Sequence, residues 1–395
     1  MLHQNKRIYL FSPYCILRPT TNRIFDMRLA DGFAGHGANV TVIYPYTFMK
    51  ENIRKDEIPR SFGLQHPVKC RMQYTPLREF TSKKIRSVIL VIAFSFTALR
   101  VFFSQLISRE DTIIFSRDAK LLVTALLLKK IFSPFKRVKV IYMCAEVKNS
   151  ALLRFVLKNS SGVFAGVTTV VDAIEKLVKI PPEKFILSLA PVPSFIHDCS
   201  KEEARKMIRY ESTEPLVVYT GKIGPGINEL KYILEAAAQL PGCRIIATGG
   251  KASNVEYYRK YCADHHITNV TFTGFFNDST FVRYYQLAAD VLVSYYTSKD
   301  HMVEFNYPQK LNEYLSTRNP IVTPDFAATR DVINDKNVFF VEPDNSSALA
   351  AGILKVIQDK EAAKKIADQA YEDAKKLTFE SRTLEVLAFI DTLRN

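Results

Sequence analysis

The sequence lacks the cysteine patterns that mark disulfide frameworks and zinc sites. Its six cysteines are scattered along the chain, at Cys15, Cys70, Cys144, Cys199, Cys243 and Cys262. No two of them form a C-x-x-C pair, and no histidines stand beside them at zinc-ligand spacing. Because disulfides persist mainly in oxidising compartments, we interpret these residues as reduced thiols of a cytoplasmic protein.

Low-complexity tracts and internal repeats are also missing. Hydrophobic residues make up 47% of the chain and charged residues 24%, which are values typical of globular proteins. The N-terminal stretch MLHQNKRIYLFSPY has a basic start, but its apolar run stops at Ser12 and Pro13. We therefore expect a first β-strand there and no signal peptide.

The sequence has no apolar run of the length that crosses a membrane. Residues 78–110 come nearest, with an apolar stretch from Val88 to Leu99 that Arg100 interrupts. A spanning helix needs roughly 20 apolar residues. Two interpretations remain open: a buried core helix, or a helix that lies on a bilayer and places its basic residues among anionic headgroups.

Positive charge is concentrated in one half of the chain. The net charge is +14, yet residues 1–195 contain 30 Lys and Arg against 13 Asp and Glu, whereas residues 196–395 contain 24 against 27. A one-sided charge of this kind indicates that one domain faces an anionic surface or substrate. We do not expect nucleic-acid binding, because the basic half shows no recognisable binding module.

The length of 395 residues favours two domains. The first half alternates apolar strand patterns with helical ones, for example a strand at 7–13, a helix at 24–37 and a strand at 39–45, which is typical of a parallel α/β sheet. The same rhythm restarts at residue 215, and the chain from residue 346 onward is helical. We predict domains at 1–198 and 199–378, with residues 379–395 forming a helix that packs back on the first domain.

Strand-to-helix turns are where open parallel sheets bind ligands. The turn TGKIGPG, residues 220–226, joins glycines to Lys222 ahead of a helix, so its backbone N–H groups and the lysine suit a phosphate group. The alternative is a plain glycine turn, since the spacing matches neither G-x-G-x-x-G nor a P-loop. The turns around Gly249 and Phe275 are two further candidates of this kind.

The segment EFNYPQKLNEYLSTRNPIV, residues 304–322, lies at another such edge. Its helix is predicted to start near Pro308 and to carry Lys310 and Glu313. A carboxylate at Glu313 can accept two hydrogen bonds from vicinal hydroxyls, as a ribose presents them. Taken alone, Glu313 and Glu304 are more often solvated surface charges.

Together these segments form an ordered series between Tyr219 and Asp359, namely YTGKI, NVTFTGFF, AADVLVSYY, NEYLSTRNPIV and NVFFVEPDNSSALAAGILKVIQD. The series resembles the C-terminal domain of GT-B glycosyltransferases of the retaining group 1 family, polysaccharide-assembly type. In the first half only LADGFAGHGANVTVIYP resembles that family. The resemblance implies an α/β fold of two Rossmann-like domains that face a cleft.

The resemblance also implies a nucleotide-sugar donor in the second domain, used as a substrate with no cofactor and no essential metal. It assigns the donor ribose to Glu313 and the diphosphate to Lys222 and the Gly221 turn. The remaining residues that it implies for donor binding are Gly249, Phe275, Phe305, Asn306, Tyr307 and Pro308.

The sequence departs from the family pattern at several positions. The glutamate expected at position 305 is replaced by Phe305, so Glu304 becomes the nearest acid, and Lys310 becomes the substitute for a missing second basic residue. In the first domain Glu146 is the ionisable group nearest the expected histidine. On the acceptor side the candidates are Arg18, Arg23 and Arg117, so the catalytic candidates are Glu304, Lys310 and Glu146.

We therefore predict a cytoplasmic glycosyltransferase that acts on a saccharide or lipid-linked acceptor in polysaccharide or glycolipid assembly, peripheral to the inner face of the cell membrane through residues 78–110. Two alternatives stay open. One is a nucleotide-sugar epimerase of the same fold. The other is a non-catalytic partner subunit, which the substitution at Phe305 and the missing basic residue would explain.

Overall fold

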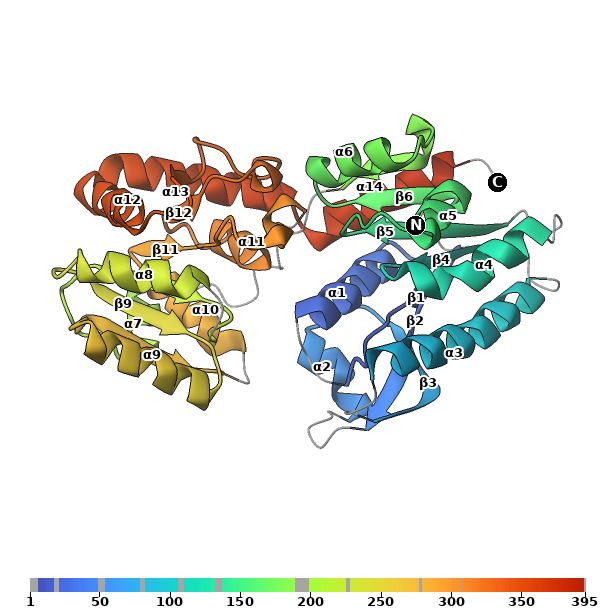
Figure 1. The fold of residues 1–395 in the computed structure, drawn as a ribbon, viewed down its shortest axis with the longest axis horizontal. Coiled ribbons are helices and arrows are strands. Elements are labelled where there is room, and N and C mark those ends of the chain that lie inside the picture. The colour runs from blue at the N-terminus through green and yellow to red at the C-terminus, as the bar shows by residue number, and fades with distance from the viewer. Residues whose placement is uncertain are drawn as a thin grey trace. The chain divides into compact units, whose positions relative to one another are not determined.

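The chain folds into two compact units, which Figure 1 draws as a ribbon. The computed structural model describes residues 6–17, 21–48, 54–78, 82–105, 110–131, 137–188, 199–224, 228–276, 279–305 and 307–393. Unit 1 comprises Met1–Leu189 together with Phe379–Asn395, and unit 2 comprises Ala190–Thr378. Each unit is a parallel sheet flanked by helices, as predicted for two Rossmann-like domains. The boundary falls at Leu189, and residues 189–198 lie outside the described part of the chain.

The described residues of unit 1 form a seven-stranded parallel sheet in the order β3-β2-β1-β4-β5-β6-β7. The strands are β1 (Lys6–Phe11), β2 (Asn39–Phe48), β3 (Lys69–Arg78), β4 (Asp111–Ser116), β5 (Val138–Cys144), β6 (Gly162–Ala165) and β7 (Phe185–Leu187). The helices are α1 (Thr21–Gly35), α2 (Ile58–Phe62), α3 (Lys83–Ser104), α4 (Ala119–Ile131), α5 (Ala151–Asn159), α6 (Thr168–Leu177) and α14 (Phe379–Thr392).

Both faces of this sheet are covered, which explains why its central strands are apolar throughout. Ile8 and Leu10 of β1 belong to a core cluster shared with α1 and α14, whereas Phe11 packs edge-on against Phe94 of α3 at 5.1 Å between ring centroids. Every residue of β5 is buried, including Lys139. The ammonium group of Lys139 donates to the carbonyl oxygen of Ile390 at 2.7 Å.

The last helix, α14, is an integral part of unit 1. It packs against α1, and Val386, Leu387 and Ile390 lie in the unit 1 core cluster, each 1% exposed or less. A close approach between the two helices occurs at Gly32, where an added Cβ would lie 2.7 Å from the hydroxyl oxygen of Thr383. The hydrophobic core of unit 1 therefore includes residues of α14, which follows unit 2 along the chain.

The described residues of unit 2 form a six-stranded parallel sheet in the order β10-β9-β8-β11-β12-β13. Its strands are β8 (Leu216–Thr220), β9 (Arg244–Thr248), β10 (Val270–Gly274), β11 (Val291–Val293), β12 (Ile321–Pro324) and β13 (Phe339–Val341). Its α-helices are α7 (Lys201–Met207), α8 (Asn228–Ala238), α9 (Ala252–Asp264), α10 (Ser279–Ala288), α11 (Gln309–Leu315), α12 (Ser346–Gln358) and α13 (Lys360–Lys376).

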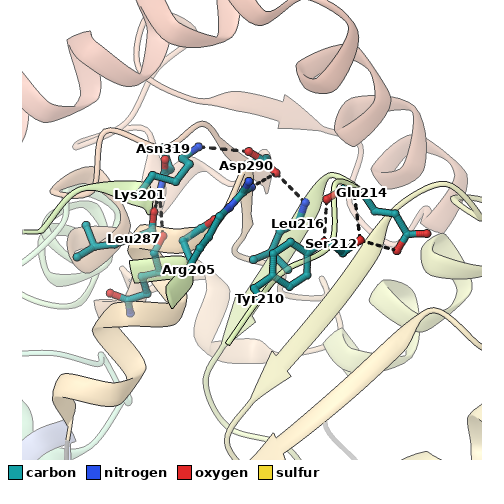
Figure 2. Close-up of polar contacts among 11 residues, drawn as sticks. Lys201, Arg205, Tyr210, Ser212, Glu214, Leu216, Leu287, Asp290 and Asn319 are labelled. Carbon is teal, nitrogen blue, oxygen red and sulfur yellow. Dashed lines mark hydrogen bonds and ion pairs between the residues drawn. The ribbon is translucent and has the colours of Figure 1, made fainter. Parts of the chain in front are cut away.

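An acidic side chain joins the amino-terminal ends of the central strands of unit 2, as Figure 2 shows. Asp290, just before β11, accepts a hydrogen bond from the backbone N–H of Leu216 at 2.8 Å and pairs with Arg205 at 2.6 Å and Lys201 at 3.3 Å. It therefore ties β8, β11 and α7 together. The aspartate in the AADVLVSYY segment has a structural role in this unit.

The basic, apolar segment at 78–110 forms α3 in its described part. The helix begins after Ser82, whose hydroxyl accepts from the N–H of Ile85 at 3.4 Å. One face of α3 is buried, including Leu90 and Phe94, while other apolar side chains such as Phe96 are exposed. The buried-helix interpretation therefore holds for one face of α3, and contact of the other face with a bilayer stays a prediction.

Candidate functional site

The candidate site lies at the carboxyl-terminal ends of β8 and β11. The strand order reverses between these two neighbours, and such switch points are where ligands of open α/β sheets bind. The chain leaves β8 through Gly221 and Lys222, and it leaves β11 through Tyr295 and Tyr296. The sheet therefore brings the first glycine turn and the segment around Lys310 to one edge.

Three glycine turns interlock at this edge. The N–H of Gly221 donates to the carbonyl oxygen of Thr248 at 2.9 Å, and the N–H of Gly249 donates to the carbonyl oxygen of Gly274 at 2.9 Å. Gly249 has a φ of 128°, and a Cβ there would lie 1.9 Å from the carbonyl oxygen of Gly221. Because no side chain fits, glycine at 249 is required for the turns to pack, whatever it contributes to a ligand.

The turn after β8 is held in place by side chains from β8 and α9. The hydroxyl of Tyr219 donates to the carbonyl oxygen of Lys222 at 3.1 Å. Asn254 donates to the carbonyl oxygen of Ile223 at 2.9 Å, and Tyr258 donates to that of Gly224 at 3.0 Å. Three consecutive carbonyl oxygens of the turn thus accept hydrogen bonds from within unit 2, while the Lys222 side chain is exposed. Residues 225–227 lie outside the described part of the turn.

Lys310 reaches the same turn from α11. Its ammonium nitrogen lies 4.1 Å from the centroid of the Tyr219 ring and 4.6 Å from that of Tyr296, so it contacts both aromatic faces. It also lies 3.1 Å from the position of a Cβ at Gly221. The predicted substitute charge is therefore beside the glycine turn.

Glu313 is joined to the end of β8 through a buried glutamine. The amide nitrogen of Gln286 donates to Oε2 of Glu313 at 2.8 Å and to Oγ1 of Thr220 at 3.2 Å. The next residue, Tyr314, accepts from the N–H of Thr220 at 2.8 Å. Burial is the largest influence on the Tyr314 phenol and raises its pKa, so this group stays protonated. The Glu313 carboxylate is consequently fixed relative to Gly221.

The segment before α11 is mixed in its exposure. Glu304 ends a short 3-10 helix, His301–Glu304, and is exposed, Phe305 is half-buried, and Asn306 lies outside the described residues. Tyr307 and Pro308 are buried, and burial raises the pKa of the Tyr307 phenol well above its usual range. The Tyr307 phenol is therefore closed to solvent in this structure. A small pocket beside this segment is lined by Tyr296, Asp300, Val303, Pro308, Thr323, Phe326 and Thr329.

Phe275 follows β10 at the same end of the sheet. Phe275 is 71% exposed, the second-highest exposure among the large hydrophobic residues that the structure describes as exposed. An exposed ring at a strand end can stack on a planar base. Phe275 stays a prediction for that contact.

In unit 1, Arg117 follows β4 and is fixed by a buried acid. Its guanidinium lies 3.5 Å from Oδ1 of Asp26 and 5.3 Å from the centroid of the Phe25 ring. Burial raises the pKa of the Asp26 carboxyl, and the Arg117 charge and a 2.8 Å hydrogen bond from Ser12 oppose that rise.

Three further unit 1 residues were candidates from the sequence. Glu146 follows β5 and pairs with Lys148 at 2.9 Å, and Arg23 is half-buried in α1. Arg18 lies outside the described residues. The acceptor and catalytic roles of these three residues stay predictions.

No sequence pattern predicts the roles of Gln286, Tyr314 and Asp26. Gln286 and Tyr314 fix Glu313 and the end of β8, and Asp26 fixes Arg117. None stands in a recognisable spacing, because their partners lie 14 to 94 residues away along the chain. The usable signal is weak: Asp26 is an acid on the apolar face of a predicted helix. Among the described residues, no group of three or more His, Cys, Asp or Glu side chains is placed to hold a metal ion.

Comparison with known proteins agrees with this geometry. Residues 214–359 match the family model described as "Glycosyl transferases group 1". This match confirms that the unit 2 segment resembles group 1 glycosyl transferases, and it covers the whole of the candidate site in unit 2. A search of curated proteins finds no match.

Similar solved structures cover nearly the whole chain. Sucrose-phosphate synthase from Thermosynechococcus elongatus is 16% identical, with a TM-score of 0.73 over 98% of this chain and 99% of that one. Anabaena Alr3699/HepE, solved with UDP, is 16% identical with a TM-score of 0.73 over 98% and 100%. The lipopolysaccharide outer core galactosyltransferase WaaB, in its apo form, is 12% identical with a TM-score of 0.67 over 98% and 99%. The two units therefore have the GT-B fold.

Proposed function

We propose that this chain is a glycosyltransferase that transfers a sugar from a nucleotide-sugar donor to a saccharide acceptor. The observation that carries the proposal is the arrangement of Lys310, Glu313 and the Gly221 turn at the switch point of the unit 2 sheet, inside the segment that matches the glycosyl transferases group 1 model. The solved complexes of HepE with UDP and with UDP-glucose support a uridine nucleotide sugar as the first donor to test.

Each residue of this arrangement has a chemical role that fits the donor. Glu313, held by Gln286, accepts hydrogen bonds from the ribose hydroxyls. The Gly221 turn, Lys222 and Lys310 stabilise the negative charge that grows on the diphosphate as it leaves. With two lysines at that position the reaction uses no essential metal and no cofactor. Phe275 stacks on the base, and Glu304 serves the transferred sugar, with retention at the anomeric carbon.

The acceptor belongs to unit 1 in this proposal. The excess of positive charge in residues 1–195 favours an anionic acceptor, and Arg117, fixed by Asp26, is the best-defined cation for it. A lipid-linked saccharide with a phosphate group fits these features and places the enzyme on the inner face of the cell membrane, in polysaccharide or glycolipid assembly. WaaB, a lipopolysaccharide galactosyltransferase of the same fold, supports that assignment.

The donor site is tested by replacing its two charged residues one at a time. We expect Glu313→Ala and Lys310→Met each to weaken UDP-sugar binding by roughly 10- to 100-fold, because each removes a charge-assisted hydrogen bond. Isothermal titration calorimetry measures the affinity. Glu361→Ala and Lys364→Met, both on the exposed surface of α13, are matched controls. Unchanged affinity in the two site variants would remove the proposed site.

Transfer itself is tested with donor, lipid-linked acceptor and EDTA in one assay, with the anomeric configuration of the product read by NMR. We expect retention, unchanged rates with EDTA, and a large loss of rate in Glu304→Gln with nearly unchanged donor affinity. Isomerised sugar nucleotide formed without an acceptor would instead identify an epimerase. Donor binding without turnover on any acceptor would instead identify a non-catalytic partner.

A further inference from the structure

Helix α3 presents two different apolar faces. One face is buried in unit 1 through Leu90, Ala93, Phe94, Ala98 and Phe102. The helix packs against β3 and α4, which Figure 1 shows beside it. These buried side chains are sufficient to hold α3 in the core of unit 1. The fold therefore does not require the opposite face of the helix to be apolar.

The opposite face carries a continuous apolar row. Its members recur at helical spacing and are each between 53% and 63% exposed: Ile85, Val88, Ile92, Phe96 and Phe103. From Ile85 to Phe103 the row runs along about 27 Å of helix, at 1.5 Å per residue. We call it the α3 row. Single exposed apolar residues need no explanation, but a contiguous set marks an interaction surface.

Neighbouring elements extend this surface. On α4, Lys120 donates to the hydroxyl of Ser87 at 2.8 Å, and the hydroxyls of Thr124 and Ser95 lie 2.6 Å apart, so this row of α4 runs beside α3. Further along the same row of α4 stand Leu127 and Ile131, which are 43% and 70% exposed. The apolar surface therefore spans two helices.

Positive charge surrounds the α3 row. Lys84 near the start of the helix and Arg100 between Phe96 and Phe103 are exposed, Arg86 is half-buried, and no acidic residue occurs between Lys83 and Ser104. A surface of aromatic and aliphatic side chains with basic residues along it matches the interface of an anionic bilayer, where rings and aliphatic chains enter the headgroup region and lysine and arginine meet phosphates.

Length and composition alone would also fit a membrane-spanning helix. Among the described residues, Lys84–Ser104 has a mean hydropathy of 2.0 in its most apolar window, and 39% of that window is buried. Its buried face, however, packs on β3 and α4 of the unit 1 sheet, and Arg100 stands on the exposed face. A helix that lies flat on the bilayer surface is consistent with both observations. It keeps its contacts with the unit 1 core, and only its exposed face contacts lipid.

We propose that the α3 row, with Leu127 and Ile131 of α4, docks this protein on an anionic lipid bilayer. Lys84, Arg86 and Arg100 contact the lipid phosphates, and the α3 row enters the headgroup boundary. Docking follows from this surface alone, while its link to catalysis rests on the proposed transfer to a lipid-linked acceptor.

Flotation of the full chain with lipid vesicles tests the proposal. We expect binding to phosphatidylcholine vesicles that contain about 30% phosphatidylglycerol, weaker binding to phosphatidylcholine alone, and loss of binding as salt rises from about 0.1 M to 0.5 M. Ile92→Ser combined with Phe96→Ser should lower the affinity at least tenfold, because both residues are exposed and lose their apolar burial in the bilayer. Lys84→Gln combined with Arg100→Gln should lower it about fivefold per residue on anionic vesicles only.

Matched controls separate docking from general effects. Met207→Ser with Tyr257→Ser removes two apolar residues of unit 2 that are 52% and 53% exposed, and Lys364→Gln with Lys365→Gln removes two exposed charges. Neither pair should change vesicle binding. Full vesicle binding by the Ile92/Phe96 variant would overturn the proposal. So would a wild-type dimer, measured by analytical ultracentrifugation, that fails to bind vesicles and dissociates in that variant, since a second copy would then cover the surface.

The two proposals fail in different ways. The Ile92/Phe96 variant should keep its calorimetric affinity for UDP-sugar, because α3 belongs to unit 1 and every residue proposed for donor binding belongs to unit 2. If the wild type bound anionic vesicles but no nucleotide sugar, the proposed function would be wrong and the docking surface would stand. If it bound nucleotide sugar but no vesicles, the reverse would hold.

Discussion

At the scale of single residues, the tightest constraint in unit 2 is at Gly249. We expect Gly249→Ala to lower the free energy of unfolding by about 2 to 4 kcal/mol, because the φ of 128° is strained for alanine and its Cβ would overlap the carbonyl oxygen of Gly221. Urea denaturation measures this change. The same substitution should also weaken donor binding, since the Gly221 turn must move to make room.

Gly242→Ala is the control for that substitution. Gly242 stands between α8 and β9 in the same unit, and a Cβ there would meet nothing within 4 Å. We expect its stability and donor affinity to stay close to those of the wild type. If Gly249→Ala were as stable as Gly242→Ala, the close contact between the Gly221 and Gly249 turns would not be needed for stability.

Sequence identified Lys310 and Glu313 as candidates but not their surroundings. Their spacing within one short segment is visible in the sequence, and so is the glycine turn at Gly221. That Lys310 contacts Tyr219 and Tyr296 depends on β8 and β11 being neighbours in the sheet. This pairing crosses the chain order, so no local pattern could have predicted it.

At the scale of elements, Asp290 fastens α7 to the amino ends of β8 and β11 (Figure 2). We expect Asp290→Ala to lower the free energy of unfolding by about 1 to 3 kcal/mol, because it leaves the N–H of Leu216 and two cations without their acceptor. Donor affinity should change little below the unfolding transition, since Asp290 lies at the end of the sheet opposite Gly221. Thermal unfolding and calorimetry on the same sample give both quantities.

Asp368→Ala provides the comparison, because Asp368 is exposed on α13. It should leave the transition unchanged. A clear loss of donor affinity in Asp290→Ala at temperatures below its unfolding transition would mean that Asp290 acts on the ligand site. The structural assignment would then be incorrect.

Most elements were predictable because parallel strands covered on both faces are apolar throughout, as in β5 and β8. The strand β3 was not predicted. It lies at the edge of the unit 1 sheet, exposes Lys69, Arg71 and Tyr74, and contains Pro76, all of which are features of an edge strand and weaken the strand pattern. The two faces of α3 were not separable either, because both are apolar.

At the scale of the whole molecule, α14 makes unit 1 depend on the end of the chain. We expect Leu387→Asp to destabilise unit 1 by more than about 3 kcal/mol, because Leu387 is 0% exposed in its core and a buried carboxylate has no partner there. Limited proteolysis should then release unit 1 fragments first. Leu384→Asp, on the same helix but 47% exposed, should have no such effect. If the two variants resisted proteolysis equally well, the packing of α14 in the core would be contradicted.

The return of α14 also sets an order of assembly during synthesis. Residues 190–378 all precede Phe379–Asn395 along the chain, so the whole sequence of unit 2 is made before α14. Unit 1, although translated first, must wait with the apolar side of α1 uncovered until the last helix emerges. The core of unit 1 therefore stays incomplete while unit 2 is being translated, and during that time its uncovered apolar surface is open to aggregation or to chaperones.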